Sequence, residues 1–445
     1  MRALYNLLLW LLSPLWLLYT LVRIGSGSWR ERWWERFGFI PIPPPTSKRR
    51  LWVHCVSVGE TLAALPVLKE LRCAVPSYEI VLTTTTPTGQ RTARDSAHAW
   101  VDYFAYFPLD LPFAVKNALS RIQPDALLLF ETELWFNLIH AQHQRGGLVM
   151  VLNGRLSDRS FRRARRLRAF YRALLRAVDL ACVQSPTDAL RFVELGLSPS
   201  RVEVVGNTKF DQALEATDAN PAEWRARLSL PLDAPVIVVG STRTPDEEQL
   251  VVEAYQQVRE VLPSTCLVLA PRHLERVPEV ERLLRDYGFE PVRRTQLPLP
   301  AGTGEVSTGE VTLPVQVVLV DTFGELAQLY CIADVAVVGG AFAPLGGQNL
   351  FQPLAHGKPV FFGPHTHNFR DIALLAKEAG VGFEVRTAEE LAEGILRLLR
   401  DEKARQQIER NARELIARHQ GAARRCAQYV KQWLERTRTP RIALR

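Results

Sequence analysis

Short apolar runs alternate with longer segments of helical periodicity along most of the chain. In the first half, the apolar runs predict strands over residues 51–58, 79–86, 125–130, 148–152, 180–183 and 202–205. Helices are predicted between them, for example over residues 61–75 and 134–145. Because these strands are apolar on both faces, the pattern indicates a parallel sheet covered by helices on each side.

The same alternation restarts after a weaker stretch, residues 208–231, in which no strand is evident. The second half predicts strands over residues 236–240, 266–270, 317–320, 335–338 and 359–362. Its predicted helices cover residues 246–261, 278–287, 324–333 and 349–355 and the segment from 388 onward, and the Gly-, Pro- and Thr-rich insert 298–309 is expected to be a surface loop. A chain of 445 residues suits two domains. We therefore expect two doubly wound, Rossmann-like domains, 25–215 and 216–445, which face a cleft.

The first residues differ in kind from the rest of the chain. Residues 3–22 contain no charge and are dominated by Leu and Trp, and a helix of that length matches the thickness of a bilayer. Arginines follow at positions 23, 30, 32 and 36, which favours a cytoplasmic location for the body of the protein. We expect residues 1–24 to form a membrane anchor helix. Asn6 and Pro14 weaken a straight spanning helix, so a bent amphipathic helix lying in the interface is the alternative.

Composition narrows the possible partners without choosing one. The formal net charge is +8, mostly from arginine, which fits nucleic acid, an anionic membrane or a phosphorylated lipid. None of the six cysteines belongs to a CxxC motif, and four lie in apolar runs, at positions 55, 182, 266 and 331. These cysteines are interpreted as buried free thiols in a reducing compartment.

A strongly basic helix is predicted over residues 159–176. Its arginines are Arg159, Arg162, Arg163, Arg165, Arg166, Arg168, Arg172 and Arg176. An apolar stripe at helical spacing accompanies them, formed by Leu167, Phe170, Tyr171, Leu174, Leu175 and Val178. The segment is either a solvated helix whose stripe faces the core, or a surface that docks on anionic headgroups.

Candidate catalytic residues follow two of the predicted strands. In doubly wound sheets, ligands bind outside the carboxyl ends of the strands. Glu60 lies in a first helical turn at such an end, where it could act as a general base or merely complement the helix dipole. Glu131 and Glu133 follow the strand at 125–130, where they could face a ligand or be ordinary acids at a helix start.

Cationic and backbone groups that suit a phosphate come later in the chain. Lys209 lies near the domain boundary, where it could neutralise a leaving phosphate or be an ordinary solvated lysine. Arg272 follows the strand at 266–270 and suits a bidentate contact with an oxyanion. The glycine pairs of the loop 339–349 allow a ligand close to the backbone. The sequence contains no GxGxxG after the first strand, no GxxxxGK[ST] and no Asp-x-Asp, which argues against dinucleotide, P-loop and metal-bridged sites.

Eight strings, in this order along the chain, resemble the family that transfers Kdo (3-deoxy-D-manno-octulosonic acid) from CMP-Kdo. They are HCVSVGE (54–60), TTTTPTG (83–89), ETELW (131–135), NGRLSDRS (153–160), GNTKFD (206–211), PRH (271–273), GEL (324–326) and GPHTHNFRDI (363–372). The resemblance covers nearly the whole chain. It implies a GT-B fold, that is, two Rossmann-like domains, and an inverting transfer of Kdo to a lipid A precursor at the cytoplasmic face of the inner membrane.

The resemblance also implies roles for individual residues. Glu60 becomes the base that deprotonates the acceptor hydroxyl, and Glu131 and Lys209 become transition-state stabilisers. Contacts with CMP-Kdo fall on Pro271, Arg272, Gly324, Glu325, Leu326, Asn349, Leu350, Phe351 and Gln352. The implied partners are the CMP-Kdo donor, the lipid A precursor and an anionic membrane surface, with no cofactor, metal ion or nucleic acid.

Two positions depart from the family pattern. Gln352 replaces a glutamate expected to bind the ribose, and Arg243 stands where a histidine is usual. A neutral amide binds a hydroxyl more weakly than a carboxylate does. Two alternatives remain open at this point: a GT-B transferase that uses a UDP-sugar, and a non-catalytic basic module that binds a membrane or nucleic acid.

Overall fold

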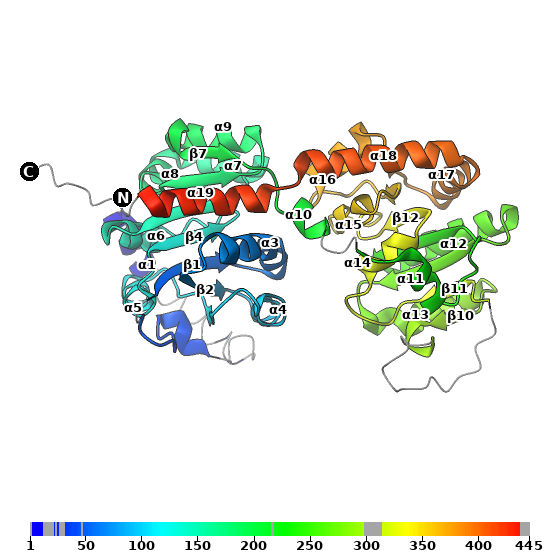
Figure 1. The fold of residues 1–445 in the computed structure, drawn as a ribbon, viewed down its shortest axis with the longest axis horizontal. Helices are drawn as coiled ribbons and strands as arrows, with labels where there is room; N and C mark the ends of the chain where they lie inside the picture. The colour runs from blue at the N-terminus through cyan, green and yellow to red at the C-terminus, as the bar shows by residue number, and fades with distance from the viewer. Residues whose placement is uncertain are drawn as a thin grey trace, which may run out of the picture. The chain divides into compact units, whose positions relative to one another are not determined.

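The computed structural model describes residues 2–11, 22, 25, 32–45, 48–214, 218–297 and 314–436. The chain forms two compact units: Met1–Gln212 with Gln420–Arg445 make unit 1, and Ala213–His419 make unit 2. Each unit contains one seven-stranded sheet in which all neighbouring strands run parallel (Figure 1). The predicted α/β class with two doubly wound sheets is confirmed.

The sheet of unit 1 has the strand order β3-β2-β1-β4-β5-β6-β7. Its strands are β1 (Arg49–Cys55), β2 (Tyr78–Thr84), β3 (Tyr103–Tyr106), β4 (Ala126–Phe130), β5 (Leu148–Gly154), β6 (Leu180–Val183) and β7 (Val202–Val204). The chain winds outward from β1 in one direction to β3 and then in the other direction from β4 to β7. The order reverses between β1 and β4, which is where such sheets bind ligands.

Helices cover both faces of this sheet because alternate strand residues point to opposite sides. Leu51, Val53 and Cys55 of β1 pack in one buried cluster, whereas Trp52 packs in the other. The first face carries α3 (Val58–Ala74), α4 (Pro87–Ala97) and α19 (Ala422–Arg436). The second face carries α5 (Pro112–Ile122), α6 (Phe136–Gln144), α8 (Arg168–Leu175) and α9 (Pro186–Leu195).

The last described helix, α19, corrects the expected domain division. We expected the second domain to extend from 216 to the end of the chain, but α19 belongs to unit 1 and contacts α3 (Figure 1). Cys426 and Val430 are fully buried in the core of unit 1. Asp211 also accepts a hydrogen bond from the backbone N–H of Ala423 at 2.8 Å. Because these contacts join segments more than 200 positions apart, the local pattern could not reveal them.

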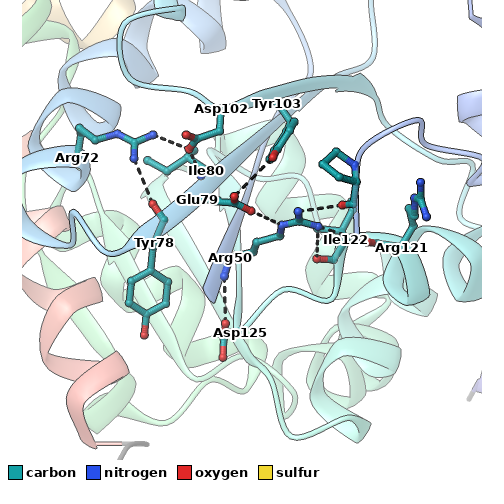
Figure 2. A network of polar contacts seen from close by, with 11 residues as sticks. Arg50, Arg72, Tyr78, Glu79, Ile80, Asp102, Tyr103, Arg121, Ile122 and Asp125 are labelled. Atoms are coloured by element: carbon teal, nitrogen blue, oxygen red, sulfur yellow. Dashed lines mark hydrogen bonds and ion pairs between the residues drawn. The ribbon is translucent and has the colours of Figure 1, made fainter. Parts of the chain in front are cut away.

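The amino ends of the strands in unit 1 are tied together by paired charges (Figure 2). The buried Arg50 guanidinium donates to Glu79 at 2.7 Å and also reaches the backbone carbonyl of Pro43 at 2.9 Å. Arg49 pairs with Asp125 at 2.7 Å, and Arg72 of α3 with Asp102 at 2.6 Å. Arg49, Arg50 and Arg72 at this edge are therefore each paired with an acid, and the pairs of Arg49 and Arg50 join β1 to β2 and to the start of β4.

Unit 2 repeats the plan with the strand order β10-β11-β9-β8-β12-β13-β14. Its strands are β8 (Val236–Thr242), β9 (Cys266–Pro271), β10 (Pro291–Arg293), β11 (Val317–Leu319), β12 (Val335–Val338), β13 (Val360–Phe362) and β14 (Gly382–Glu384). Its helices are α11 (Pro221–Arg227), α12 (Pro245–Val261), α13 (Val277–Asp286), α14 (Leu326–Leu329), α15 (Phe351–Ala355), α16 (Arg370–Glu378), α17 (Ala388–Arg400) and α18 (Glu402–His419). The insert 298–309 lies outside the described residues.

Three strands were not predicted: β3, β10 and β14. All three are edge strands of three or four residues. A run that short carries little periodicity of its own, so its pairing with a neighbouring strand decides its structure. β7, an equally short edge strand, was predicted because three valines lie within residues 202–205. The other strands agree with the predicted ones to within about three residues at each end.

The first described helix, α1 (Arg2–Leu11), covers only half of the expected anchor, and most of residues 12–24 lie outside the described residues. Tyr5 donates a hydrogen bond to Asp110 at 2.9 Å, and Asn6 accepts one from Asn137 at 2.7 Å, so one face of α1 packs on unit 1. Its other face exposes Leu4, Leu7, Leu8, Trp10 and Leu11. Among the helices described, none has the length and apolar character needed to cross a bilayer.

The arginine-rich segment is two helices and not one. α7 (Asp158–Arg166) ends and α8 begins at Leu167, whose φ of −106° and ψ of 31° break the helical geometry. All eight arginines of the segment are exposed, whereas Leu174, Leu175 and Val178 are buried. The predicted amphipathic division is confirmed for Leu174, Leu175 and Val178, but the predicted stripe is wrong at Leu167, which is 59% exposed where the two helices meet. The role of the arginine face stays a prediction.

Candidate active site

Glu60 lies in the first turn of α3, directly beyond the carboxyl end of β1. Its carboxylate accepts hydrogen bonds from the backbone N–H of Val56 at 2.8 Å and from the Ser57 hydroxyl at 3.3 Å. The side chain therefore bends back over the strand-to-helix turn. A carboxylate at a helix start also complements the dipole, so the structural and the catalytic interpretations of Glu60 are compatible.

Glu131 and Lys209 meet in unit 1 although 78 positions separate them. Their side chains form an ion pair at 3.2 Å, and each is about one-quarter exposed. Glu131 follows β4 in the left-handed region, with φ of 57°, and its N–H donates to the Leu152 carbonyl at 2.9 Å. For a residue with a side chain, this conformation costs about 1–3 kcal/mol and is commonest at functional sites.

Asn153 holds the segment that carries Lys209 in place. It is fully buried at the end of β5, also with a positive φ of 54°, and its side-chain oxygen accepts from the Thr208 N–H at 3.1 Å. Thr208 in turn donates through its hydroxyl to the Ala63 carbonyl in α3, at 2.7 Å. These two bonds connect β5, α3 and the start of α10 (Lys209–Leu214), which carries Lys209.

Charge at this end of the sheet is dominated by carboxylates. The pKa of Glu60 is raised to about 7, first by burial and also by the nearby negative charges of Glu131 and Glu133, against the lowering effect of the hydrogen bond from Val56. Burial, and then the charge of Glu131, also raises the pKa of Glu133. The three predicted catalytic residues of unit 1, Glu60, Glu131 and Lys209, thus lie in one cluster. In this cluster Glu60 can change protonation state near neutral pH.

In unit 2, the predicted donor contacts lie on loops that converge at the end of β8. Pro271 ends β9, and the Arg272 N–H donates to the Thr242 carbonyl at 2.8 Å, which places the exposed Arg272 beside β8. After β12, the backbone at Gly339 lies so close that a Cβ there would be 2.7 Å from Thr242 Cα. The ends of β8, β9 and β12 therefore form one surface of unit 2.

The third segment, Gly324–Leu326, joins this surface through a glycine in β8. A Cβ on Gly240 would lie 2.9 Å from Leu326 Cδ2, so the absence of a side chain at Gly240 lets Leu326 pack there. Gly324 has φ of 91°, a conformation that favours glycine. Glu325 pairs with the buried Arg294 at 3.2 Å and also accepts from Thr322. The Glu325 carboxylate is therefore already engaged within the protein.

The segment Asn349–Gln352 contributes in two different ways. The Asn349 side chain accepts from the Phe351 N–H at 2.9 Å and so opens the short helix α15. Leu350 and Phe351 are 1% and 4% exposed, so only their backbone could reach a ligand. His356, at the end of α15, bonds the Ala327 carbonyl of α14 at 2.8 Å and links this segment to the previous one. The partly exposed Gln352 keeps a side chain that can bind a hydroxyl.

Several residues that support the site were not predicted individually from the sequence. Asn153, Thr208 and Ser57 all belong to the family motifs, but a motif alone does not say which of its residues make contacts. Glu247 of α12, whose carboxylate accepts the backbone N–H of Arg243 at 2.9 Å, carried no such signal, because an acid in a first helical turn looks like an ordinary complement to the dipole. Within the described residues, no group of three or more His, Cys, Asp and Glu is placed to hold a metal ion.

Comparison with known proteins adds a family to this geometry. Residues 31–212 match the family described as 3-deoxy-D-manno-octulosonic-acid transferase (kdotransferase), and residues 310–415 match glycosyl transferases group 1. The 3-deoxy-D-manno-octulosonic acid transferase of Bordetella pertussis is 34% identical over 443 residues, which cover 97% of this chain and 99% of the relative. The enzyme of the same name from Haemophilus influenzae is 32% identical over 445 residues, with 98% and 99% covered.

Solved structures support the fold alone. A UDP-GlcNAc 2-epimerase from Neisseria meningitidis has a TM-score of 0.59 at 13% identity and covers 87% of this chain and 100% of its own. A glycosyltransferase from Rickettsia africae has a TM-score of 0.58 at 12% identity, with 88% and 100% covered. Two Rossmann-like units define the GT-B fold, and the match of residues 310–415 to glycosyl transferases group 1 identifies the class as glycosyltransferases. More specifically, the chain belongs to the 3-deoxy-D-manno-octulosonic acid (Kdo) transferase family.

Proposed function

We propose that this protein transfers Kdo from CMP-Kdo to a sugar hydroxyl of a lipid A precursor, with inversion at the anomeric carbon. Family membership supports Kdo as the transferred sugar. The observation that carries the proposal is the cluster in unit 1, where a carboxyl group with a pKa of about 7 lies among other acids beside one lysine. A general base works best when its pKa lies near the pH at which it operates.

In the proposed reaction, the acceptor oxygen attacks the anomeric carbon of Kdo while its proton passes to the Glu60 carboxylate. The bond between that carbon and the phosphate oxygen of CMP breaks, and CMP leaves with the bonding electrons. Positive charge develops at the anomeric carbon, and the Glu131 carboxylate stabilises it. The ammonium group of Lys209, 3.2 Å from Glu131, holds that carboxylate in place and balances negative charge on the leaving group.

Unit 2 supplies the donor contacts in this proposal. The exposed Arg272 guanidinium binds an oxyanion of CMP-Kdo through two parallel hydrogen bonds. Gln352 and the backbone of Gly324–Leu326 and Asn349–Phe351 bind the nucleoside. Because Glu325 pairs with Arg294, Glu325 contributes through its backbone and through the shape of its turn.

The direct test incubates the protein with CMP-Kdo and a tetraacylated lipid A precursor, and reads the products by mass spectrometry. A mass increase of one or more Kdo units is expected, and NMR of the new linkage reports whether the configuration has inverted. Thermal shift in parallel compares CMP with UDP. Absence of product, combined with protection by UDP and none by CMP, would replace CMP-Kdo with a uridine nucleotide sugar as the donor.

We also propose that unit 1 docks on the cytoplasmic leaflet of the inner membrane through α1 and the arginine helices. Leu4, Leu7, Leu8 and Leu11 recur at helical spacing on the exposed face of α1, while Tyr5 and Asn6 hold its other face against unit 1. Phe170 of α8 lies 5.9 Å from Tyr5, ring to ring, so α8 packs against the inner face of α1, and the exposed arginines of the segment 159–176 belong to the same part of unit 1 as α1. An apolar helix face next to arginines suits an anionic bilayer surface.

Vesicle flotation tests this docking. The protein is expected to float with vesicles that contain anionic phospholipid and to float much less with purely zwitterionic ones. Arg162→Glu with Arg166→Glu should reduce flotation, and Leu8→Glu should do so even at low salt. Equal flotation of all variants with both vesicle types would exclude this surface. Retention on immobilised RNA as strong as vesicle binding would favour the nucleic-acid alternative.

A further inference from the structure

One arginine at the surface described in unit 2 has no assigned function. Arg243 is the first residue after β8 and therefore lies between the ends of β9 and β12. Its side-chain Nε is buried, and no hydrogen-bond acceptor for it is found within the described part of the chain. A buried donor without an acceptor is destabilising, so such groups call for a specific explanation.

The two buried acids near Arg243 in sequence, Glu247 and Glu248, are already occupied, and Asp246 is exposed in the first turn of α12. The buried Glu247 carboxylate accepts the backbone N–H groups of Arg243 at 2.9 Å, Phe342 at 3.1 Å and Ala343 at 3.3 Å. The buried Glu248 carboxylate pairs with Arg276 at 2.5 Å. Glu247 thus fastens the backbone of Arg243 to the glycine-rich loop, while its oxygens remain committed to backbone groups and not to the guanidinium.

The glycine-rich loop holds the stem of Arg243 in place. A Cβ on Gly340 would lie 3.4 Å from Arg243 Cδ and 2.9 Å from Gln348 Cγ, so these two side chains pack over the bare backbone of Gly340. Arg272 follows the neighbouring strand, and its N–H bonds the carbonyl of Thr242, the residue before Arg243. Within the described residues, neither arginine side chain is paired with an acid. Two unneutralised guanidinium groups therefore emerge from adjacent strand ends.

We infer that Arg243 is a second oxyanion-binding residue of the donor site, where it binds the phosphate or the sugar carboxylate of an anionic nucleotide sugar. This inference rests on the proposed function, because CMP-Kdo carries one phosphate and one carboxylate. Its two negative groups match the two arginines in number. The planar guanidinium suits either oxyanion, since both offer two oxygens at the spacing of its N–H groups.

Isothermal titration of CMP and CMP-Kdo into the wild type, Arg243→Gln and Arg243→Lys tests the inference. Arg282→Gln is the matched control, because Arg282 is an exposed arginine on α13. Arg243→Gln is expected to weaken the binding of CMP-Kdo about ten-fold or more, and Arg243→Lys to weaken it less. Equal weakening for CMP and CMP-Kdo assigns Arg243 to the phosphate, and weakening for CMP-Kdo alone assigns it to the carboxylate. Unchanged binding of both ligands overturns the inference.

Chemical protection of the unmodified protein keeps the inference testable if the variants do not fold. Phenylglyoxal modification of Arg243, read by peptide mapping, should slow in saturating CMP-Kdo and not in cytidine, which has no oxyanion. An equal rate with and without CMP-Kdo would refute the assignment. If the wild type binds neither CMP nor CMP-Kdo, the proposed function fails. If the wild type and the Arg243 variants bind both ligands with equal affinity, only the assignment of Arg243 fails.

Discussion

The two ends of the sheet in unit 1 treat charge in opposite ways. At the amino end, Arg50 pairs with Glu79 at 2.7 Å and Arg72 with Asp102 at 2.6 Å, so positive and negative groups match (Figure 2). At the carboxyl end, Glu60 and Glu133 have raised pKa values, and Lys209 is paired with Glu131. Backbone strain does not follow this division, since Glu131 and Asn153 have positive φ values at the carboxyl end and Gln123, which precedes β4, has one at the amino end.

This contrast separates the paired charges at the amino end, which stabilise the fold, from the carboxyl groups at the carboxyl end, which are the candidates for catalysis. Matched charges favour the folded state, whereas several acids kept close together oppose it and persist only where the surrounding structure holds them. Perturbed carboxyl groups at the ligand-binding edge of a doubly wound sheet are therefore functional candidates. Variants at the two ends should differ in the property that they change.

The largest effect is expected from Glu60→Gln at the carboxyl end. Loss of the base should lower kcat/KM about 10²–10⁴-fold, while CMP binding is kept. Steady-state assays with CMP-Kdo and titration of CMP measure the two properties. Glu79→Gln is the matched control at the amino end, and its turnover per folded molecule should stay near that of the wild type. Normal turnover by Glu60→Gln would remove Glu60 from the mechanism.

Arg50→Met at the amino end should lower stability and leave catalysis unchanged. It leaves the Glu79 carboxylate without its partner and frees the Pro43 carbonyl, so the free energy of unfolding should fall by about 3 kcal/mol. Urea unfolding gives this value, and turnover corrected for the folded fraction should not change. Adding Glu79→Gln should recover part of the loss. A stability equal to that of the wild type would mean that the paired edge contributes nothing net.

A smaller effect concerns how stability depends on pH. The pKa of Glu60 rises from 4.5 to about 7 on folding, so the folded state binds the proton more tightly. The associated stability is present below pH 4.5 and is lost as pH rises toward 7. Glu60→Gln removes this loss, and its stability relative to the wild type should increase by about 1–2 kcal/mol between pH 4 and pH 8. Parallel changes in both proteins would contradict the raised pKa.

The smallest effect is expected from Glu133→Gln. The negative charge of Glu133 helps to raise the pKa of Glu60, so its removal should lower that pKa. In a profile of kcat/KM against pH, the rise near pH 7 should move to lower pH while the plateau remains. Arg72→Gln at the amino end is the control and should leave the profile in place. If the rise in kcat/KM near pH 7 stays at the same pH in Glu133→Gln, the carboxyl groups of Glu60 and Glu133 are not coupled in solution.

Sequence patterns predicted most of the fold, and they also predicted individual residues of the candidate site. Strands that are apolar on both faces, such as β4, predicted parallel sheets because only a doubly covered sheet buries them. The short edge strands β3, β10 and β14 were missed because pairing decides their structure. Single residues such as Glu60 and Glu131 could be named because they directly follow strands. The strength of that assignment came from the order of eight motifs along the chain.

By itself, the sequence determined the α/β class, the doubling of the plan, the family and the strand ends at which polar residues would gather. These properties depend on local order along the chain, which apolar runs and glycine-rich loops record directly. Only the tertiary structure decided which of these residues meet. It assigned α19 to unit 1, broke the arginine helix at Leu167, paired Lys209 with Glu131 and left Arg243 unneutralised. Such outcomes depend on burial and on contacts between distant segments, and charge and pKa follow from those contacts.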